Sequence, residues 1–139
     1  MARVLIKGNE VIAEAAIRAG VDAFFGYPIT PQNEVPEYLA RELPKHGKLF
    51  LQAESELAGI NMVLGASAAG ANVMTSTSGP GLCLMQEAIS SMALTRLPCV
   101  VVDVCRSGPG AGDLAPAQED WKISGNGAYK IPILVPGNV

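Results

Sequence analysis

The sequence has few of the residues from which proteins usually build a metal centre. Its 139 residues include one histidine and three cysteines, and no two cysteines form a Cys-x-x-Cys pair. Zinc and iron–sulfur sites normally need clusters of such residues, so we expect no metal site within this chain. Cys83, Cys99 and Cys105 lie in apolar runs, and we expect them to be buried free thiols in a reducing cytoplasm.

Charged residues are also scarce, at 17% of the sequence with a net charge of -3. No basic cluster is present, and we therefore expect no nucleic-acid partner. The apolar runs are broken by Gly, Ser, Glu or Pro well before they reach the length that spans a bilayer, which predicts no membrane contact. The composition, 49% hydrophobic with 15 glycines, is typical of one well-packed α/β domain.

The chain alternates between short apolar runs and segments of helical periodicity. We predict strands over residues 4–6, 22–26, 48–52, 72–76, 99–105 and 131–135, and helices over 9–19, 31–46, 55–69 and 82–94. This alternation predicts a doubly wound parallel sheet, with residues 99–105 as a central strand buried on both faces. We expect a single domain over residues 1–139, cut short at its C-terminal end because a further helix should follow the last strand.

Two helix starts in the middle of the chain are candidate ligand sites. Glu54 and Glu56 lie where a strand passes into a helix of small apolar residues, which should pack closely against a neighbour. Ser78-Gly79-Pro80-Gly81 turns directly into a second apolar helix. Ligands of open α/β sheets bind at such strand ends. From position alone, however, the simpler interpretation is that both carboxylates only complement a helix dipole.

Two further positions stand at expected strand ends. Thr30-Pro31 has the pattern of a helix start, with threonine as the N-cap and proline at the first helical position. Arg106 directly follows the longest apolar run, and its position fits a solvated arginine as well as a ligand-binding one. A long loop rich in glycine and proline comes next, and we expect Trp121 and Tyr129 to pack this loop down or to meet another subunit.

Taken together, four motifs are similar to those of a known enzyme family. They are Tyr27-Pro28-Ile29-Thr30-Pro31, Glu56, Thr77-Ser78-Gly79-Pro80-Gly81 and Arg106-Ser107-Gly108-Pro109-Gly110. With these motifs in this order, the chain resembles the 2-oxoacid:ferredoxin oxidoreductases over essentially its whole length, and more narrowly the N-terminal pyrimidine-binding domain of their α subunit. That family uses thiamine diphosphate to convert a 2-oxoacid and coenzyme A into acyl-CoA and carbon dioxide, and it reduces ferredoxin through iron–sulfur clusters.

The resemblance implies a role for each motif. Glu56, with Glu54 as the alternative, would hydrogen-bond the pyrimidine ring of thiamine diphosphate and drive the tautomer change that activates the cofactor. Thr30 and Arg106 would contact the substrate carboxylate, the arginine in bidentate geometry. The pyrimidine side of the cofactor would also be lined by Tyr27, Pro28, Ile29, Ser78 and Gly79.

The sequence lacks the Gly-Asp-Gly motif with which the family holds the diphosphate and its metal. The resemblance therefore implies that a diphosphate-binding β subunit holds that group and Mg²⁺, that the iron–sulfur clusters lie in partner chains, and that this chain alone is inactive. The expected partners are the other subunits of a hetero-oligomer, ferredoxin, a 2-oxoacid and coenzyme A. The glycine run after Arg106 is more similar to the 2-oxoisovalerate branch than to the 2-oxoglutarate branch, whereas residues 113–121 do not match the family pattern cleanly.

Two other functional classes remain as alternatives. One is a non-catalytic interaction module derived from such a domain, which would only stabilise a partner. The joint presence of Thr30, Glu56 and Arg106 argues against it, because structure alone does not require all three. The other is a nucleotide-binding α/β domain with Ser78-Gly79-Pro80-Gly81 as its phosphate loop. It ranks last because the P-loop lysine and the dinucleotide glycine fingerprint are both missing.

Overall fold

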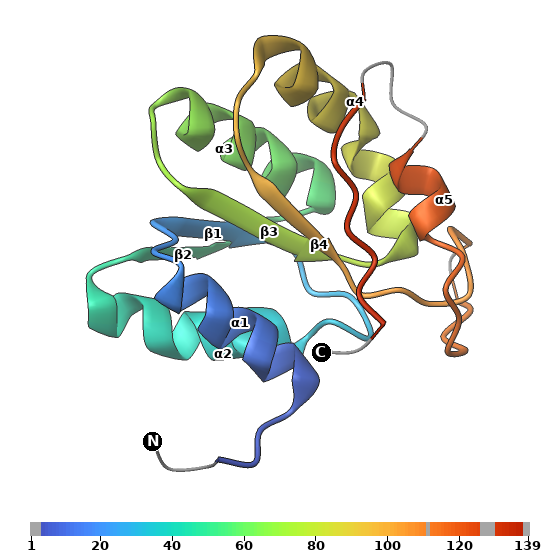
Figure 1. Ribbon diagram of the computed structural model, residues 1–139, viewed down its shortest axis with the longest axis horizontal. Helices are drawn as coiled ribbons and strands as arrows, with labels where there is room; N and C mark the ends of the chain where they lie inside the picture. Colours follow the sequence, from blue (N-terminus) through green and yellow to red (C-terminus); the bar gives the residue numbers. More distant parts are fainter. Residues whose placement is uncertain (1–3, 111, 126–129, 138–139) are drawn as a thin grey trace.

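The computed structural model describes residues 4–110, 112–125 and 130–137, so that Tyr129 lies outside the described ranges. The strands form one parallel sheet in the order β2-β1-β3-β4, with helices on both faces (Figure 1). The strands are β1 (Ala23–Gly26), β2 (Leu49–Gln52), β3 (Val73–Thr77) and β4 (Val100–Asp103). The helices are α1 (Gly8–Arg18), α2 (Glu34–Glu42), the 3-10 helix η1 (Leu43–His46), α3 (Glu56–Ala68), α4 (Gly79–Thr95) and α5 (Trp121–Ser124). The predicted doubly wound α/β class is confirmed.

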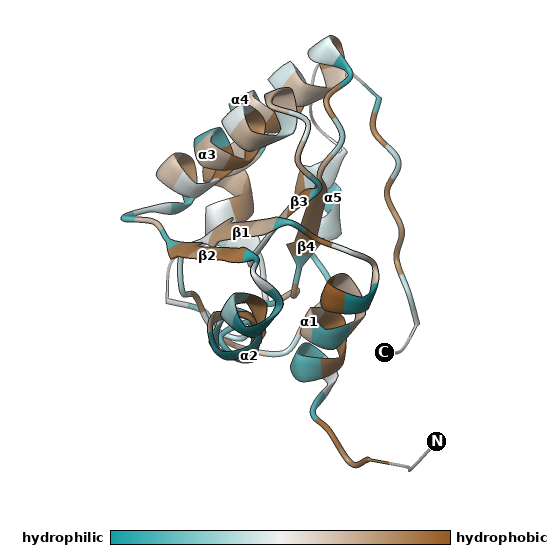
Figure 2. Ribbon diagram, turned by 90° about the vertical axis from the view of Figure 1, so that its left-hand side faces the viewer, coloured by the Kyte–Doolittle hydropathy of each residue, from teal (hydrophilic) through white to brown (hydrophobic). Residues whose placement is uncertain are grey.

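Each face of the sheet has its own hydrophobic core. Helices α1 and α2 cover one face, and α3 and α4 cover the other (Figure 1). Successive strand residues point to opposite faces, so Phe24 packs in the core under α1 and α2 while Phe25 packs in the core under α3 and α4. Figure 2 shows the difference between the two layers, because α2 is mostly hydrophilic whereas α4 is pale to brown along most of its length.

The helix of small residues begins and ends as predicted, for local reasons. The Ser55 side chain caps α3 by accepting a hydrogen bond from the Ala58 amide at 3.1 Å. After the helix, Gly70 takes a positive φ of 88°, which a glycine adopts at low cost. Within α3, a Cβ at Gly59 would lie 3.5 Å from the Gly26 Cα. The small residues therefore let α3 approach the backbone of β1 closely.

Three predicted strands differ from the structure. Residues 4–6 form no strand, and Val4 and Leu5 are exposed. The run 99–105 gives an edge strand rather than a central one, since β4 pairs only with β3 and Val100 is 58% exposed. Residues 131–135 form no strand either, although Ile131 packs against the core under α3 and α4. An apolar run forms a strand only where a neighbouring strand supplies hydrogen-bond partners. Among the described residues, no segment pairs with residues 4–6, with residues 131–135 or with the outer side of β4.

The three cysteines are free thiols as predicted, but the prediction that all three are buried is wrong. Cys83 lies exposed on α4, and Cys99 and Cys105 are half-buried. The apolar periodicity of α4 did not distinguish the face that carries Cys83 from the face that packs on the sheet. Trp121 is also exposed, at the start of α5. Within the described ranges, none of the helices combines the length and the hydropathy needed to span a bilayer.

Candidate active site

The predicted motifs gather at one edge of the sheet. Because all four strands are parallel, their carboxyl ends lie on the same side, which is where ligands of open α/β sheets bind. Tyr27 follows β1 directly, Ser78 follows β3, and Arg106 comes shortly after β4. Glu56 opens α3, after the end of β2. The fold thus places four motifs that are distant in sequence at a common edge.

The two candidate glutamates differ in their surroundings. Glu54 is exposed, whereas Glu56 is 7% exposed and is the first residue of α3. No other residue in the described part of the chain forms a salt bridge or a side-chain hydrogen bond with the Glu56 carboxylate. A buried carboxylate is unfavourable without a partner, beyond what the helix N-terminus offers. Of the two, Glu56 is therefore the carboxylate placed to meet a ligand.

Gly81 explains how α4 can pack against this glutamate. A Cβ at Gly81 would lie 2.1 Å from Thr77 Oγ1, 2.7 Å from Glu56 Cγ and 2.9 Å from Glu56 Oε1. Real Cβ atoms essentially never approach other atoms so closely, so only glycine fits at this position without displacing a neighbour. The second glycine of the Ser78-Gly79-Pro80-Gly81 motif therefore makes room for the Glu56 side chain.

Thr30 is not a helix N-cap, contrary to the prediction. Helix α2 begins at Glu34, after Asn33, and residues 30 and 31 form a turn. The buried side chain of Gln32 fixes this turn, because its amide donates to the Tyr27 carbonyl at 3.1 Å and accepts from the Ser76 hydroxyl. The contact with β3 holds the backbone in a turn where sequence pattern alone favoured a helix. Gln32 was not predicted, since nothing local distinguishes it.

Arg106 lies beside Thr30 and is not a solvated arginine. It is 5% exposed, and its Nη1 donates to the Thr30 carbonyl at 3.0 Å. Its Nε has no partner among the described residues. No described carboxylate forms a salt bridge with its guanidinium. A buried guanidinium without a carboxylate partner suits a carboxylate ligand, which the planar group binds in bidentate geometry.

A buried aspartate that was not predicted joins two of the motifs. Asp120 is completely buried, and its Oδ2 accepts hydrogen bonds from the backbone amides of Gly79 and Arg106, each at 2.9 Å. The predicted cofactor contact Ser78 lies next to this junction, and its hydroxyl is buried without a partner among the described residues. Asp120 precedes the short helix α5, so the sequence offered at most the signal of an ordinary N-cap.

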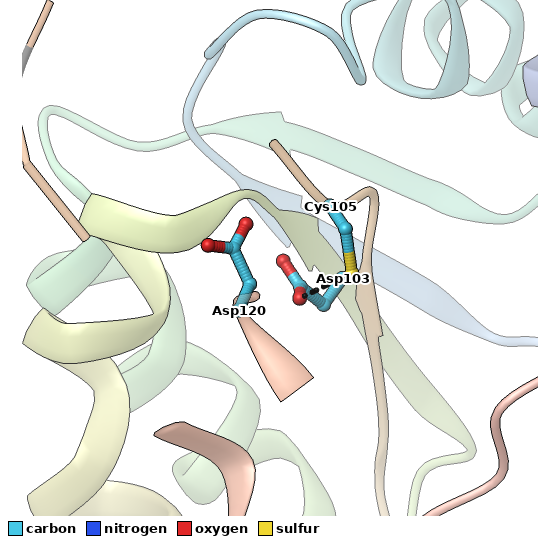
Figure 3. A group of neighbouring side chains, drawn as sticks. All are labelled: Asp103, Cys105 and Asp120. Atoms are coloured by element: carbon cyan, nitrogen blue, oxygen red, sulfur yellow. Dashed lines mark hydrogen bonds between the residues drawn. The ribbon is translucent and has the colours of Figure 1, made fainter. Parts of the chain in front are cut away.

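Asp103, Cys105 and Asp120 form a compact group beside this junction (Figure 3). The Cys105 sulfur and one carboxylate oxygen from each aspartate, the atoms that could bind a metal ion, all lie within 4.8 Å of one another. The Cys105 thiol donates a hydrogen bond to the Asp103 carboxylate at 3.3 Å. Burial, helped by the neighbouring Asp103 carboxylate, raises the pKa of Cys105 to about 12. A thiol with this pKa stays protonated near neutral pH. In the structure the group consists of a carboxyl–thiol hydrogen bond beside an aspartate that binds two backbone amides.

Burial also raises the pKa of Asp103 to about 6 from its ordinary value of 3.8, and the charge of Asp120 adds to this effect. Between these values the folded chain keeps a proton that the unfolded chain has lost. The free energy of unfolding therefore falls as the pH rises through this window. In the native subunit we expect the free energy of unfolding to be lower at about pH 7 than at about pH 4, by an amount on the order of 1 kcal/mol that comes from Asp103. Asp103→Asn should abolish this difference, which urea unfolding at the two pH values measures. An identical pH dependence in both proteins would contradict the burial of an ionisable Asp103.

Comparison with known proteins gives consistent relatives. Residues 14–139 match the family described as pyruvate flavodoxin/ferredoxin oxidoreductase, thiamine diphosphate-binding. The chain is 49% identical to ketoisovalerate oxidoreductase subunit VorB of Methanothermobacter thermautotrophicus, over 100% of this chain and 41% of that protein. It is 47% identical to 2-oxoglutarate synthase subunit KorA of Archaeoglobus fulgidus, over 97% of this chain and 40% of that protein. The chain thus spans about two fifths of the length of these curated relatives.

A solved structure is also similar to the chain. It is the 2-oxoglutarate:ferredoxin oxidoreductase from Magnetococcus marinus with 2-oxoglutarate, coenzyme A and succinyl-CoA bound. The match has a TM-score of 0.78 and 47% sequence identity, and it covers 80% of this chain and 19% of that one.

Proposed function

The chain belongs to the thiamine diphosphate-binding family of pyruvate flavodoxin/ferredoxin oxidoreductases, and we therefore propose that it is the pyrimidine-binding part of a 2-oxoacid:ferredoxin oxidoreductase. The complete enzyme would decarboxylate a 2-oxoacid in the presence of coenzyme A, form acyl-CoA and carbon dioxide, and reduce ferredoxin. The observation that carries this proposal is Glu56, a residue only 7% exposed whose carboxylate forms no salt bridge with the other described residues. A ring nitrogen of the cofactor pyrimidine would be the partner of this carboxylate.

The residues at this edge fit the pyrimidine half of thiamine diphosphate. Gly81 leaves room for Glu56, and the unpaired buried hydroxyl of Ser78 lies at the N-terminus of α4. We assign the pyrimidine contacts to Glu56, Ser78 and Gly79, together with residues 27–29 after β1. The sequence contains no Gly-Asp-Gly motif, so we assign the diphosphate and Mg²⁺ to a β subunit and the iron–sulfur clusters to other partner chains.

The chemistry would be divided between the cofactor and this chain. Bound thiamine diphosphate would supply the electron sink that lets the carboxylate carbon leave the 2-oxoacid. Glu56 would hold and release a proton at a carboxylate oxygen that faces the pyrimidine ring. Arg106 and Thr30 would bind the carboxylate of the substrate, with the arginine oriented by its hydrogen bond to the Thr30 carbonyl.

Within the wider proposal, residues 1–139 form a single pyrimidine-binding domain. Its three cysteines are free, which fits a cytoplasmic location. The identity to VorB (49%) and to KorA (47%) is nearly the same, so our choice of 2-oxoisovalerate as the substrate rests on the glycine run after Arg106. A kcat/KM higher for 2-oxoglutarate than for 2-oxoisovalerate would contradict this choice.

Arg106→Lys tests the substrate contact. Lysine keeps the charge but loses the planar pair of donors, so we expect the KM for the 2-oxoacid to rise about 10- to 100-fold while the KM for coenzyme A stays unchanged. The measurement is reduction of an acceptor dye by the complete complex, dependent on both substrates. Arg96→Lys, at the exposed C-terminal end of α4, is the matched control. An unchanged KM for the 2-oxoacid would remove Arg106 from the substrate site.

The same assay separates the proposed enzyme from the alternative interaction module. If the chain is part of the proposed enzyme, the native complex will reduce the dye only when a 2-oxoacid and coenzyme A are both present. A complex that assembles fully but is inactive with 2-oxoisovalerate, 2-oxoglutarate and pyruvate would favour a purely structural role for this chain.

A further inference from the structure

Asp120 is a fully buried carboxylate that has no part in the chemistry proposed above. Its Oδ2 atom accepts two backbone hydrogen bonds, one from Gly79 and one from Arg106, both at 2.9 Å. Gly79 belongs to the cofactor-binding motif at the start of α4, and Arg106 belongs to the substrate-binding motif after β4. One side chain therefore links two parts of the candidate site that are separate in the sequence.

Through its hydrogen bond with Gly79, Asp120 caps α4. The Gly79 amide is the first of the helix and has no partner within it, and the N-cap residue Ser78 forms no side-chain cap hydrogen bond. Asp120 supplies the missing acceptor from outside the helix, and its charge is favourable beside a helix N-terminus. A Cβ at Gly79 would lie 2.7 Å from Asp120 Oδ1 and 2.6 Å from the Gly108 carbonyl oxygen. Glycine at position 79 is thus what lets the carboxylate approach so closely.

Through its second hydrogen bond, Asp120 holds the backbone amide of Arg106. The guanidinium of the same arginine donates to the Thr30 carbonyl, so Arg106 is held at its amide and at its side chain. Asp120 is itself held by α5, because its carbonyl accepts from the Ile123 amide at 2.9 Å and Ile123 packs against the core under α3 and α4. The chain of contacts runs from the core through α5 and Asp120 to Arg106.

We propose that Asp120 is a positioning residue for 2-oxoacid binding, which fixes the Arg106 backbone at the N-terminus of α4 so that the guanidinium faces the substrate carboxylate. This inference rests on the proposed function. Asp120 does not touch the substrate and acts only through Arg106. A purely structural cap would affect stability or assembly, whereas a positioning residue changes substrate binding and needs Arg106 in order to do so.

The test compares Asp120→Ala with Asp120→Asn in the complete complex. Alanine leaves both amides without an acceptor, so we expect the KM for the 2-oxoacid to rise about tenfold or more, with the KM for coenzyme A unchanged. Asparagine keeps an acceptor oxygen at the same place and should recover most of the loss. Glu119→Ala, which removes the neighbouring exposed carboxylate, should behave like the native complex.

A double-mutant cycle distinguishes positioning from a structural role. In an Arg106→Ala background there is no guanidinium to position, and Asp120→Ala should then add almost nothing to the KM. An equal increase in both backgrounds, or an unchanged KM in an assembled Asp120→Ala complex, would overturn the inference. Should the alanine variant not assemble, Asp120→Glu replaces it, because the added methylene displaces the carboxylate while keeping its charge, and the same outcomes apply. A native complex inactive with every 2-oxoacid would overturn the proposed function together with this inference.

Discussion

Replacing Glu56 with glutamine is expected to lower the turnover of the complete complex at least about 100-fold. Glutamine has nearly the same shape as glutamate, but it can neither take up nor release a proton. Reduction of an acceptor dye, dependent on a 2-oxoacid and coenzyme A, measures the loss. Size-exclusion chromatography of the same sample should show an intact complex, because no described residue depends on the Glu56 carboxylate for an ion pair.

Glu54→Gln is the matched control for this experiment. Glu54 lies two positions earlier and is exposed, so its loss should leave turnover essentially unchanged. If Glu56→Gln turned over like the native complex, the assignment of the activating glutamate to Glu56 would be wrong. A large loss in Glu54→Gln alone would then move the assignment to Glu54.

Gly81→Ala should have the second largest effect. The added methyl group would overlap the Thr77 hydroxyl and the Glu56 side chain, at 2.1 Å and 2.7 Å respectively. Both neighbours stand on regular elements, β3 and α3, so relieving the overlap displaces the glutamate from its position. We expect turnover to fall by up to about 100-fold, together with a loss of about 1 to 3 kcal/mol in the free energy of unfolding.

Gly65→Ala controls for the general effect of alanine in place of a helical glycine. Gly65 lies exposed in α3, and a Cβ there meets nothing within 4 Å. Alanine should therefore stabilise the subunit by about 0.5 to 1 kcal/mol and leave turnover unchanged. Thermal or urea unfolding of both variants, with dye reduction alongside, makes the comparison. A fully active Gly81→Ala complex would show that the close contact between α4 and Glu56 has no functional role.

The sequence was sufficient for elements whose limits depend on local chemistry. Helix α3 is an example, because Ser55 caps its start and Gly70 takes the positive φ that follows its end. The prediction for Thr30 failed for the opposite reason. The turn there depends on a hydrogen bond between Gln32 and Ser76, residues 44 positions apart. Similarly, an apolar run predicts that 99–105 is a strand, but its place in the sheet depends on which other segments pair with it.

The candidate site was predictable only through the resemblance between its motifs and a family. Position alone did not distinguish Glu56 from Glu54, and their difference in burial appears only when α4 packs against α3. Asp120 was missed because its partners are distant, 41 residues away at Gly79 and 14 residues away at Arg106. No periodicity or spacing marks such a residue, and its role becomes visible only once the loop after Arg106 is folded back on α4.

The most direct test of Glu56 as the activating group needs no substrate. It is the rate at which the C2 proton of bound thiamine diphosphate exchanges with deuterium, measured by quenched-flow NMR on the native and Glu56→Gln complexes. We expect the exchange rate to fall at least about 100-fold in the variant, with the same amount of cofactor bound. Equal exchange rates in the two complexes would contradict the role proposed for Glu56.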